Sequence, residues 1–161
     1  MAIEALSRPE TSEYAGFFAP YLARVPEADA LPALEGQLDE LLPLLEAISE
    51  ALAGHRYAPE KWSIRQVVGH LSDAERVFGY RMFRFSRKDE TPLSGFDEDH
   101  FVAHGGYDQR TLKDLTAEFR HLREANLCMI RGFEPPMLTL AGTANGHPIS
   151  VRALAFVMVG H

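Results

Sequence analysis

The sequence predicts an all-α protein: a bundle of four long helices, with a short leading helix and long connecting loops. Two observations predict this fold class. Apolar residues recur at three- and four-residue steps through separate segments, which is the period of amphipathic helices. The 161 residues are enough for one sizeable core, and they contain no internal repeat, low-complexity tract or long linker. One domain over residues 1–161 is therefore expected.

The leading segment is expected to form a short helix that packs across the main body. Thr11 or Ser12 can cap it, Pro20 disturbs it and Pro26 ends it. Its apolar side is rich in aromatic residues: Tyr14, Phe17, Phe18, Tyr21 and Leu22. A surface groove for a partner is the alternative interpretation of this side.

A second helix is expected from Pro32 to about Ala53, with Gly54 closing it. Pro43 should kink this helix, because proline lacks the N–H donor and clashes with the preceding turn. The helix carries an unbroken inner stripe of apolar residues: Leu34, Leu38, Leu41, Leu45, Ile48 and Leu52.

The central stretch, Lys61–Phe85, begins with Ser63 and Gln66 at capping-box spacing, which satisfies two backbone donors at a helix start. Its apolar face consists of Ile64, Val67, Leu71, Ala74, Phe78, Met82 and Phe85. The flank of that face carries His70, Asp73, Val77 and Arg81. A histidine in this position can point into a bundle, and the simpler interpretation is a boundary histidine with one hydrogen bond.

Residues 87–110 form the longest irregular segment, and long ordered loops are often functional. His100 and His104 are four residues apart, so on a helix both rings would share one face and could bind a metal. Nearby acids are candidate oxygen ligands: Asp97, Glu98 and Asp99. A histidine pair without a third strong ligand is common, so a metal site here is the secondary interpretation.

The next helix is expected to be capped by Thr111 and ended by Gly132. Its apolar stripe consists of Leu112, Leu115, Phe119, Leu122, Met129 and Ile130. Cys128 falls off this stripe, and no sequence feature indicates an activated thiolate there. Within residues 137–150, Asn145-Gly146 is a strong tight-turn signal and predicts a small hairpin.

Ser150 is expected to cap the last helix, whose inner face consists of Val151, Leu154, Ala155, Met158 and His161. A helix over residues 151–161 reaches only about 17 Å, whereas helices of more than 20 residues reach roughly 30 Å or more. Such a short helix would leave half of its neighbours' apolar length uncovered. We therefore expect the natural protein to continue past His161.

Composition narrows the classes of function. The net charge of −7 argues against nucleic-acid binding, which needs a clustered basic surface. No apolar run approaches the roughly 20 residues of a membrane span, and no signal peptide is recognisable. Cys128 is the one cysteine, so an internal disulfide is excluded and a reducing, cytoplasmic location is expected.

Four segments that cover most of the chain resemble the DinB-like superfamily, in the branch with a Lys-Trp-Ser motif, here at residues 61–63. They read RPETSEYAGFFAPYLARVPEADAL, YAPEKWSIRQVVGHLSDAERVFGYR, PLSGFDEDHFV and GTANGHPISVRALAFVMVGH. The resemblance implies a four-helix bundle in up-down-down-up order, a homodimer, and a divalent metal, zinc or nickel, that three histidines hold between helices.

Two of the implied ligands have matching positions in this sequence. His70 stands in the Gly-His-Leu motif, and His161 matches the first residue of a His-x-x-x-His motif whose second histidine would follow four residues later. The remaining histidines match no ligand position: His55, His100, His104, His121 and His147. Asp73 or Glu75 could orient a ligand or relay a proton; a solvated helix face shared with Arg76 is the equal alternative.

Function is inferred from this resemblance. Neutral imidazoles with open coordination positions are typical of a catalytic metal site. The resemblance implies a divalent-metal-dependent enzyme that transfers a low-molecular-weight thiol to an electrophilic small molecule, in a pocket shaped by residues 87–110. A metal-dependent hydrolase is one alternative. The other is a non-catalytic, stress-induced metal-binding bundle, since the superfamily name refers to induction by DNA damage.

Overall fold

The structure is a computed structural model, in which residues 3–161 are described. Helices account for most of them: α1 Ala19–Leu22, α2 Ala30–Glu46, α3 Ile64–Ser86, α4 Glu98–His104, α5 Leu112–Arg131 and α6 Val151–Gly160. The strands β1 Ala141–Ala144 and β2 His147–Ser150 pair in one antiparallel hairpin. None of the helices in residues 3–161 is long and apolar enough to cross a membrane. The predicted all-α fold class is confirmed.

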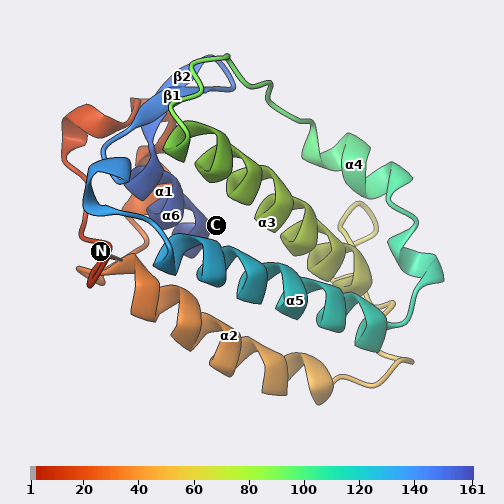
Figure 1. Ribbon diagram of the computed structural model, residues 1–161. Helices are drawn as coiled ribbons and strands as arrows, with labels where there is room; N and C mark the ends of the chain where they lie inside the picture. The colour runs from red at the N-terminus through yellow and green to blue at the C-terminus, as the bar shows by residue number, and fades with distance from the viewer. Residues whose placement is uncertain (1–2) are drawn as a thin grey trace.

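Helices α2, α3, α5 and α6 form the bundle. Helix α3 packs against α5 and α6, and α2 packs against the same two helices, so α2 and α3 lie on opposite corners. Figure 1 shows that α2 and α6 run in one direction and α3 and α5 in the other. The order along the chain is therefore up-down-down-up. The long connection through α4 returns the chain to the starting end of α3, which allows α3 and α5 to run parallel.

Helix α2 ends earlier than its apolar stripe predicts. It contains Pro43, stops at Glu46, and leaves Leu52 half exposed in a turn. Tertiary contacts account for the early end: the Glu50 carboxylate forms an ion pair with Arg65 and accepts backbone N–H bonds at the start of α5. If α2 continued through Glu50, this cap on α5 would be lost. The cap matters because the first backbone N–H groups of a helix have no acceptor within the helix itself.

Helix α3 begins as the sequence predicts, with reciprocal side-chain bonds between Ser63 and Gln66. The buried face is rotated slightly from the predicted one, so Val67 is 43% exposed and Val68 is buried. The reason is that α3 has neighbours on several sides, α5, α6 and α4 among them. A helix covered this way also buries polar positions that a simple apolar stripe omits.

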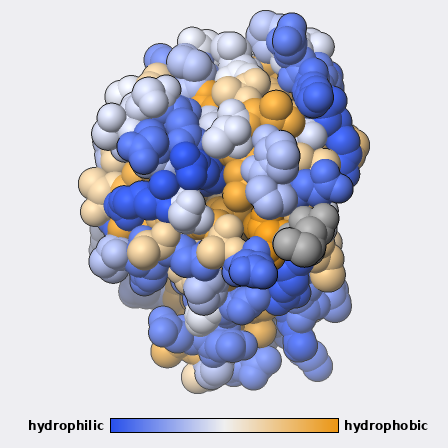
Figure 2. All heavy atoms as spheres, turned by 60° about the vertical axis from the view of Figure 1, so that its left-hand side comes forward, coloured by the Kyte–Doolittle hydropathy of each residue, from blue (hydrophilic) through white to orange (hydrophobic). Residues whose placement is uncertain are grey.

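The leading segment packs across the bundle as expected, although it forms two short 3₁₀ turns and the single-turn α1 instead of one helix. Phe18 and Leu22 are buried against the main core, while Phe17 stays half exposed. The hairpin is closed by Asn145 and Gly146, both with positive φ, as the tight-turn signal predicts. Figure 2 shows the face where this segment lies as mostly hydrophilic, with apolar side chains visible in gaps.

Helix α6 approaches α1 so closely that Gly160 has no room for a side chain. A Cβ at Gly160 would lie 2.0 Å from the backbone carbonyl oxygen of Tyr21. We expect Gly160→Ala to lower the free energy of unfolding by about 1–3 kcal/mol, as overpacking does. The matched control is Gly36→Ala in α2, where nothing lies within 4 Å. It should raise stability by about 0.5–1 kcal/mol. Urea unfolding measures both; equal effects would contradict the close approach.

Candidate metal centre

His70 and His161 meet between two helices of the bundle. His70 lies in the second turn of α3, whose start is fixed by the Ser63 cap. His161 follows the last residue of α6, and its backbone N–H continues the helical pattern by donating to Val157 O. The two Nε2 atoms are 3.1 Å apart. The structure thus brings together the two histidines that the resemblance singled out, from positions 91 residues apart.

Burial makes both imidazoles hard to charge. His70 is 7% exposed, and burial lowers its pKa. The negative charges of Glu98, Asp73 and Asp99 act in the opposite direction, and burial is the larger effect. Burial and the neighbouring His70 lower the pKa of His161 to about 4. At pH 7 both rings are therefore neutral, and a neutral imidazole is the form that binds a metal.

A carboxylate lies within reach of the two rings. Glu98, the first residue of α4, places an oxygen 4.0 Å from His70 Nε2, and ligand atoms of His70, Glu98 and His161 lie within 4.8 Å of one another. The Glu98 side chain is 58% exposed and can rotate. In the sequence, Glu98 is a candidate ligand beside His100 and His104. Its proximity to His70 depends on the path of the loop before α4, and the spacing of residues along the chain does not predict that path.

The donor set fits a divalent metal. Two bonds of roughly 2.0–2.1 Å at octahedral or tetrahedral angles place ligand nitrogens roughly 2.8–3.4 Å apart. The observed 3.1 Å between Nε2 atoms falls in this range. Aromatic rings enclose the pair: Trp62 lies 4.8 Å from the His70 ring, and Phe78 lies 5.4 Å from the His161 ring, centroid to centroid. The site is thus partly shielded from water, which strengthens electrostatic interactions within it.

Asp73 and Glu75, the two acids near His70 on α3, have different surroundings. Asp73 accepts a hydrogen bond from the Tyr107 hydroxyl, and its charge reaches His70 without a direct contact. Glu75 is 3% exposed and forms an ion pair with Arg123 at 2.7 Å. The interpretation of Glu75 as part of a solvated helix face is therefore wrong. His70 Nδ1 is buried, and no partner for it exists among residues 3–161.

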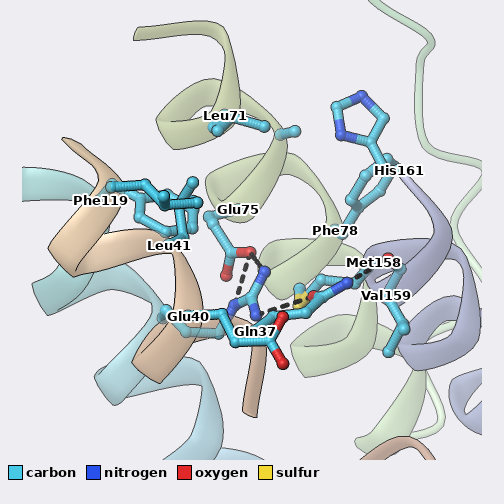
Figure 3. A pocket seen from close by; sticks show the side chains of 13 residues that line it. Gln37, Glu40, Leu41, Leu71, Glu75, Phe78, Phe119, Met158, Val159 and His161 are labelled. Atoms are coloured by element: carbon cyan, nitrogen blue, oxygen red, sulfur yellow. Dashed lines mark hydrogen bonds and ion pairs between the residues drawn. The ribbon is translucent and has the colours of Figure 1, made fainter. Parts of the chain in front are cut away.

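A cavity of about 270 Å³ opens where α6 ends. Figure 3 shows Glu75 near its middle, His161 and Phe78 on one side, and Phe119 and Leu41 on the other. Helices α2, α3, α5 and α6 all contribute to its walls. Most of the lining is apolar, and its polar residues are His161, the ion pair Glu75–Arg123, Gln37 and Glu40.

The alternative pair, His100 and His104, lies away from this centre on the exposed face of α4. The centroids of the two rings are 4.2 Å apart with the rings tilted by 34°, and His104 Nδ1 is 2.8 Å from the His100 carbonyl oxygen. Nδ1 of His104 is thus occupied by the backbone. In the described residues the only group of three or more His, Cys, Asp or Glu side chains spaced to hold a metal is His70, Glu98 and His161, so the His100 and His104 pair has no third ligand.

Comparisons with known proteins agree with the fold. YfiT from Bacillus subtilis has a solved structure that matches with a TM-score of 0.70 and 16% identity, over 96% of this chain and 84% of that one. It is described as "a probable metal-dependent hydrolase with an unusual four-helix bundle topology". No curated protein matches the sequence. A family model described as the DinB superfamily matches residues 33–161, and this chain therefore belongs to the DinB superfamily.

Proposed function

We propose that this protein is a divalent-metal-dependent enzyme in which His70 and His161 are metal ligands and Glu98 supplies a neighbouring carboxylate. One observation carries the proposal: the neutral imidazole nitrogens of buried His70 and half-buried His161 lie 3.1 Å apart with an acid in reach. Zinc or nickel is the expected ion, because imidazole ligands suit both. Two or three protein ligands would leave coordination positions open for a reactant.

The proposed reaction is transfer of a low-molecular-weight thiol to an electrophilic small molecule. A divalent ion supplies Lewis-acid chemistry that favours the anionic form of a nucleophile at neutral pH. The chain's own residues set the conditions for that step: Trp62 and Phe78 restrict water, and Asp73 contributes a negative charge near His70. Residues 87–110 bring Glu98 to the centre, so this loop is the proposed border of the substrate site.

Hydrolysis is the second candidate reaction, because the structurally similar YfiT is described as a metal-dependent hydrolase. The same donor set serves either reaction, since both need an activated nucleophile beside an electrophilic centre. A non-catalytic metal-binding bundle is the remaining alternative.

The distinguishing experiment is an activity assay of zinc-loaded and nickel-loaded protein, with and without an added small thiol. The substrates are a haloalkane-type electrophile, whose loss reports thiol transfer, and an activated ester, whose cleavage reports hydrolysis. Thiol transfer predicts consumption of the electrophile only when thiol and metal are both present. Ester cleavage without thiol supports the hydrolase. If the metal binds and neither substrate reacts, the non-catalytic alternative replaces both.

A further inference from the structure

Arg81 is a buried cation without an acidic partner. It lies on the same flank of α3 as His70, about three turns further along the helix. The residue is 4% exposed, and its guanidinium donates one hydrogen bond, from Nη2 to the Ser94 carbonyl oxygen at 3.0 Å. Within residues 3–161 no carboxylate lies within ion-pair distance of it, and no aromatic ring stacks on it.

Arg123 provides the internal comparison, because it is equally buried at 4% exposure. Its guanidinium has a carboxylate partner, Glu75, and a backbone acceptor, Leu34 O. A buried charge is tolerated when it is paired and hydrogen-bonded in this way, and is costly otherwise. Burial lowers the pKa of Arg81, and no acid offsets that shift. The Arg81 guanidinium therefore lacks the counter-charge that Arg123 has.

Residues 93–96, between α3 and α4, form the cover over Arg81, because the Ser94 carbonyl oxygen accepts its hydrogen bond. Ser94 and Gly95 in this cover are themselves exposed. Leu93 anchors the cover by exchanging backbone hydrogen bonds with Thr143 and Asn145 of the hairpin. The fully buried polar atoms that lack a partner do not include any nitrogen of Arg81. The guanidinium nitrogens of Arg81 that lack a partner therefore keep some contact with solvent.

We propose that Arg81 binds the oxyanion of a small ligand, a carboxylate or phosphate group, between α3 and residues 93–96. The planar guanidinium fork matches the two oxygens of such a group, and charge-assisted hydrogen bonds of this kind are strong. The free N–H groups of Arg81 supply the donors, and the bound anion supplies the missing counter-charge. This site stands apart from the proposed metal centre and does not depend on it.

The test is a titration of metal-free, ¹⁵N-labelled protein with inorganic phosphate and, separately, with acetate. It follows the Nε–H resonance of Arg81 and the backbone amide resonances of Ser94 and Gly95, which also report on binding in the Arg81 variants. We expect a saturable shift of these resonances. Arg81→Met should weaken binding at least tenfold, and Arg81→Lys should weaken it less, because lysine keeps the charge but loses the fork. The matched control is Arg87→Met, which removes an exposed arginine from the C-cap of the same helix and should leave binding unchanged.

Two further arms keep the result decisive. His70→Ala should bind phosphate as the wild type does; loss of binding there would place the anion at the metal centre and overturn the Arg81 site. If Arg81→Met does not fold, the wild-type resonance still decides, since no saturable shift with either anion refutes the proposal. Saturation by phosphate alone identifies a phosphate ligand, and saturation by acetate as well identifies carboxylates as ligands.

Discussion

Replacing His70 by alanine is expected to abolish divalent-metal binding by this protein. The substitution removes one of two imidazoles whose Nε2 atoms face each other at 3.1 Å, and it leaves His161 with Glu98 as the remaining donors. Loss of an outer-sphere partner alone typically costs 10–100-fold in affinity, so loss of a direct ligand should cost more than roughly 100-fold. Competition with a chromophoric chelator, for zinc and for nickel separately, measures the effect.

His100→Ala and His104→Ala are the matched controls, because they remove histidines of the same protein that lie outside the centre. Both should bind metal as the wild type does. Glu98→Gln should weaken binding by an intermediate amount if the carboxylate joins the coordination sphere. Retained metal in the His70 variant together with loss in the His104 variant would move the site to α4. Unchanged binding in every variant would remove the metal centre proposed for the bundle.

Much of the fold follows from local signals in the sequence. The capping residues Ser63, Thr111 and Ser150 each accept the backbone N–H bond expected at a helix start, because this interaction involves only neighbouring residues. The Asn145-Gly146 turn likewise needs only its own positive φ angles. Helix order and direction required the family resemblance, since stripe periodicity does not say which helices are neighbours.

The errors arise where distant contacts decide. Leu52 belongs to a regular stripe and was expected inside α2, yet Glu50 caps α5 and ends the helical path before it. Val67 fits the apolar period of α3 but faces outward, since other helices set the rotation of α3. A one-dimensional period records spacing along the chain, and it contains no information about such long-range partners.

The candidate site shows the same division. His70 and His161 could be singled out because their motifs match a family pattern, while the approach of Glu98 depends on the path of residues 87–97. Nothing in the spacing of Glu75 distinguishes a solvated acid from a buried one. The arginine that pairs with Glu75 lies 48 residues away on α5, and only the packing of α3 on α5 brings the two together.

The Glu75–Arg123 pair is expected to be the most sensitive polar contact in the bundle. Its side chains are 3% and 5% exposed, and both make further bonds: Asn126 donates to Glu75, and Arg123 donates to Leu34 O. Removing one partner leaves the other charge buried and unpaired in the core, which typically costs about 3–5 kcal/mol of stability. Arg123→Met and Glu75→Met should each lower the free energy of unfolding by this amount.

The double variant Glu75→Met/Arg123→Met distinguishes two costs: that of leaving a buried charge unpaired, and that of losing the attraction between the two charges. With both charges gone the pocket becomes apolar, and replacing a buried pair by apolar residues of similar volume is often near neutral. We therefore expect the double variant to be more stable than either single variant in urea unfolding. Arg131→Met is the control on the same helix, because it breaks an exposed pair with Glu35. It should cost about 0–1 kcal/mol. If the double variant loses as much unfolding free energy as the two single variants together, this account is contradicted. Additive losses would mean that the two residues contribute independently and that neither single variant leaves an unpaired buried charge.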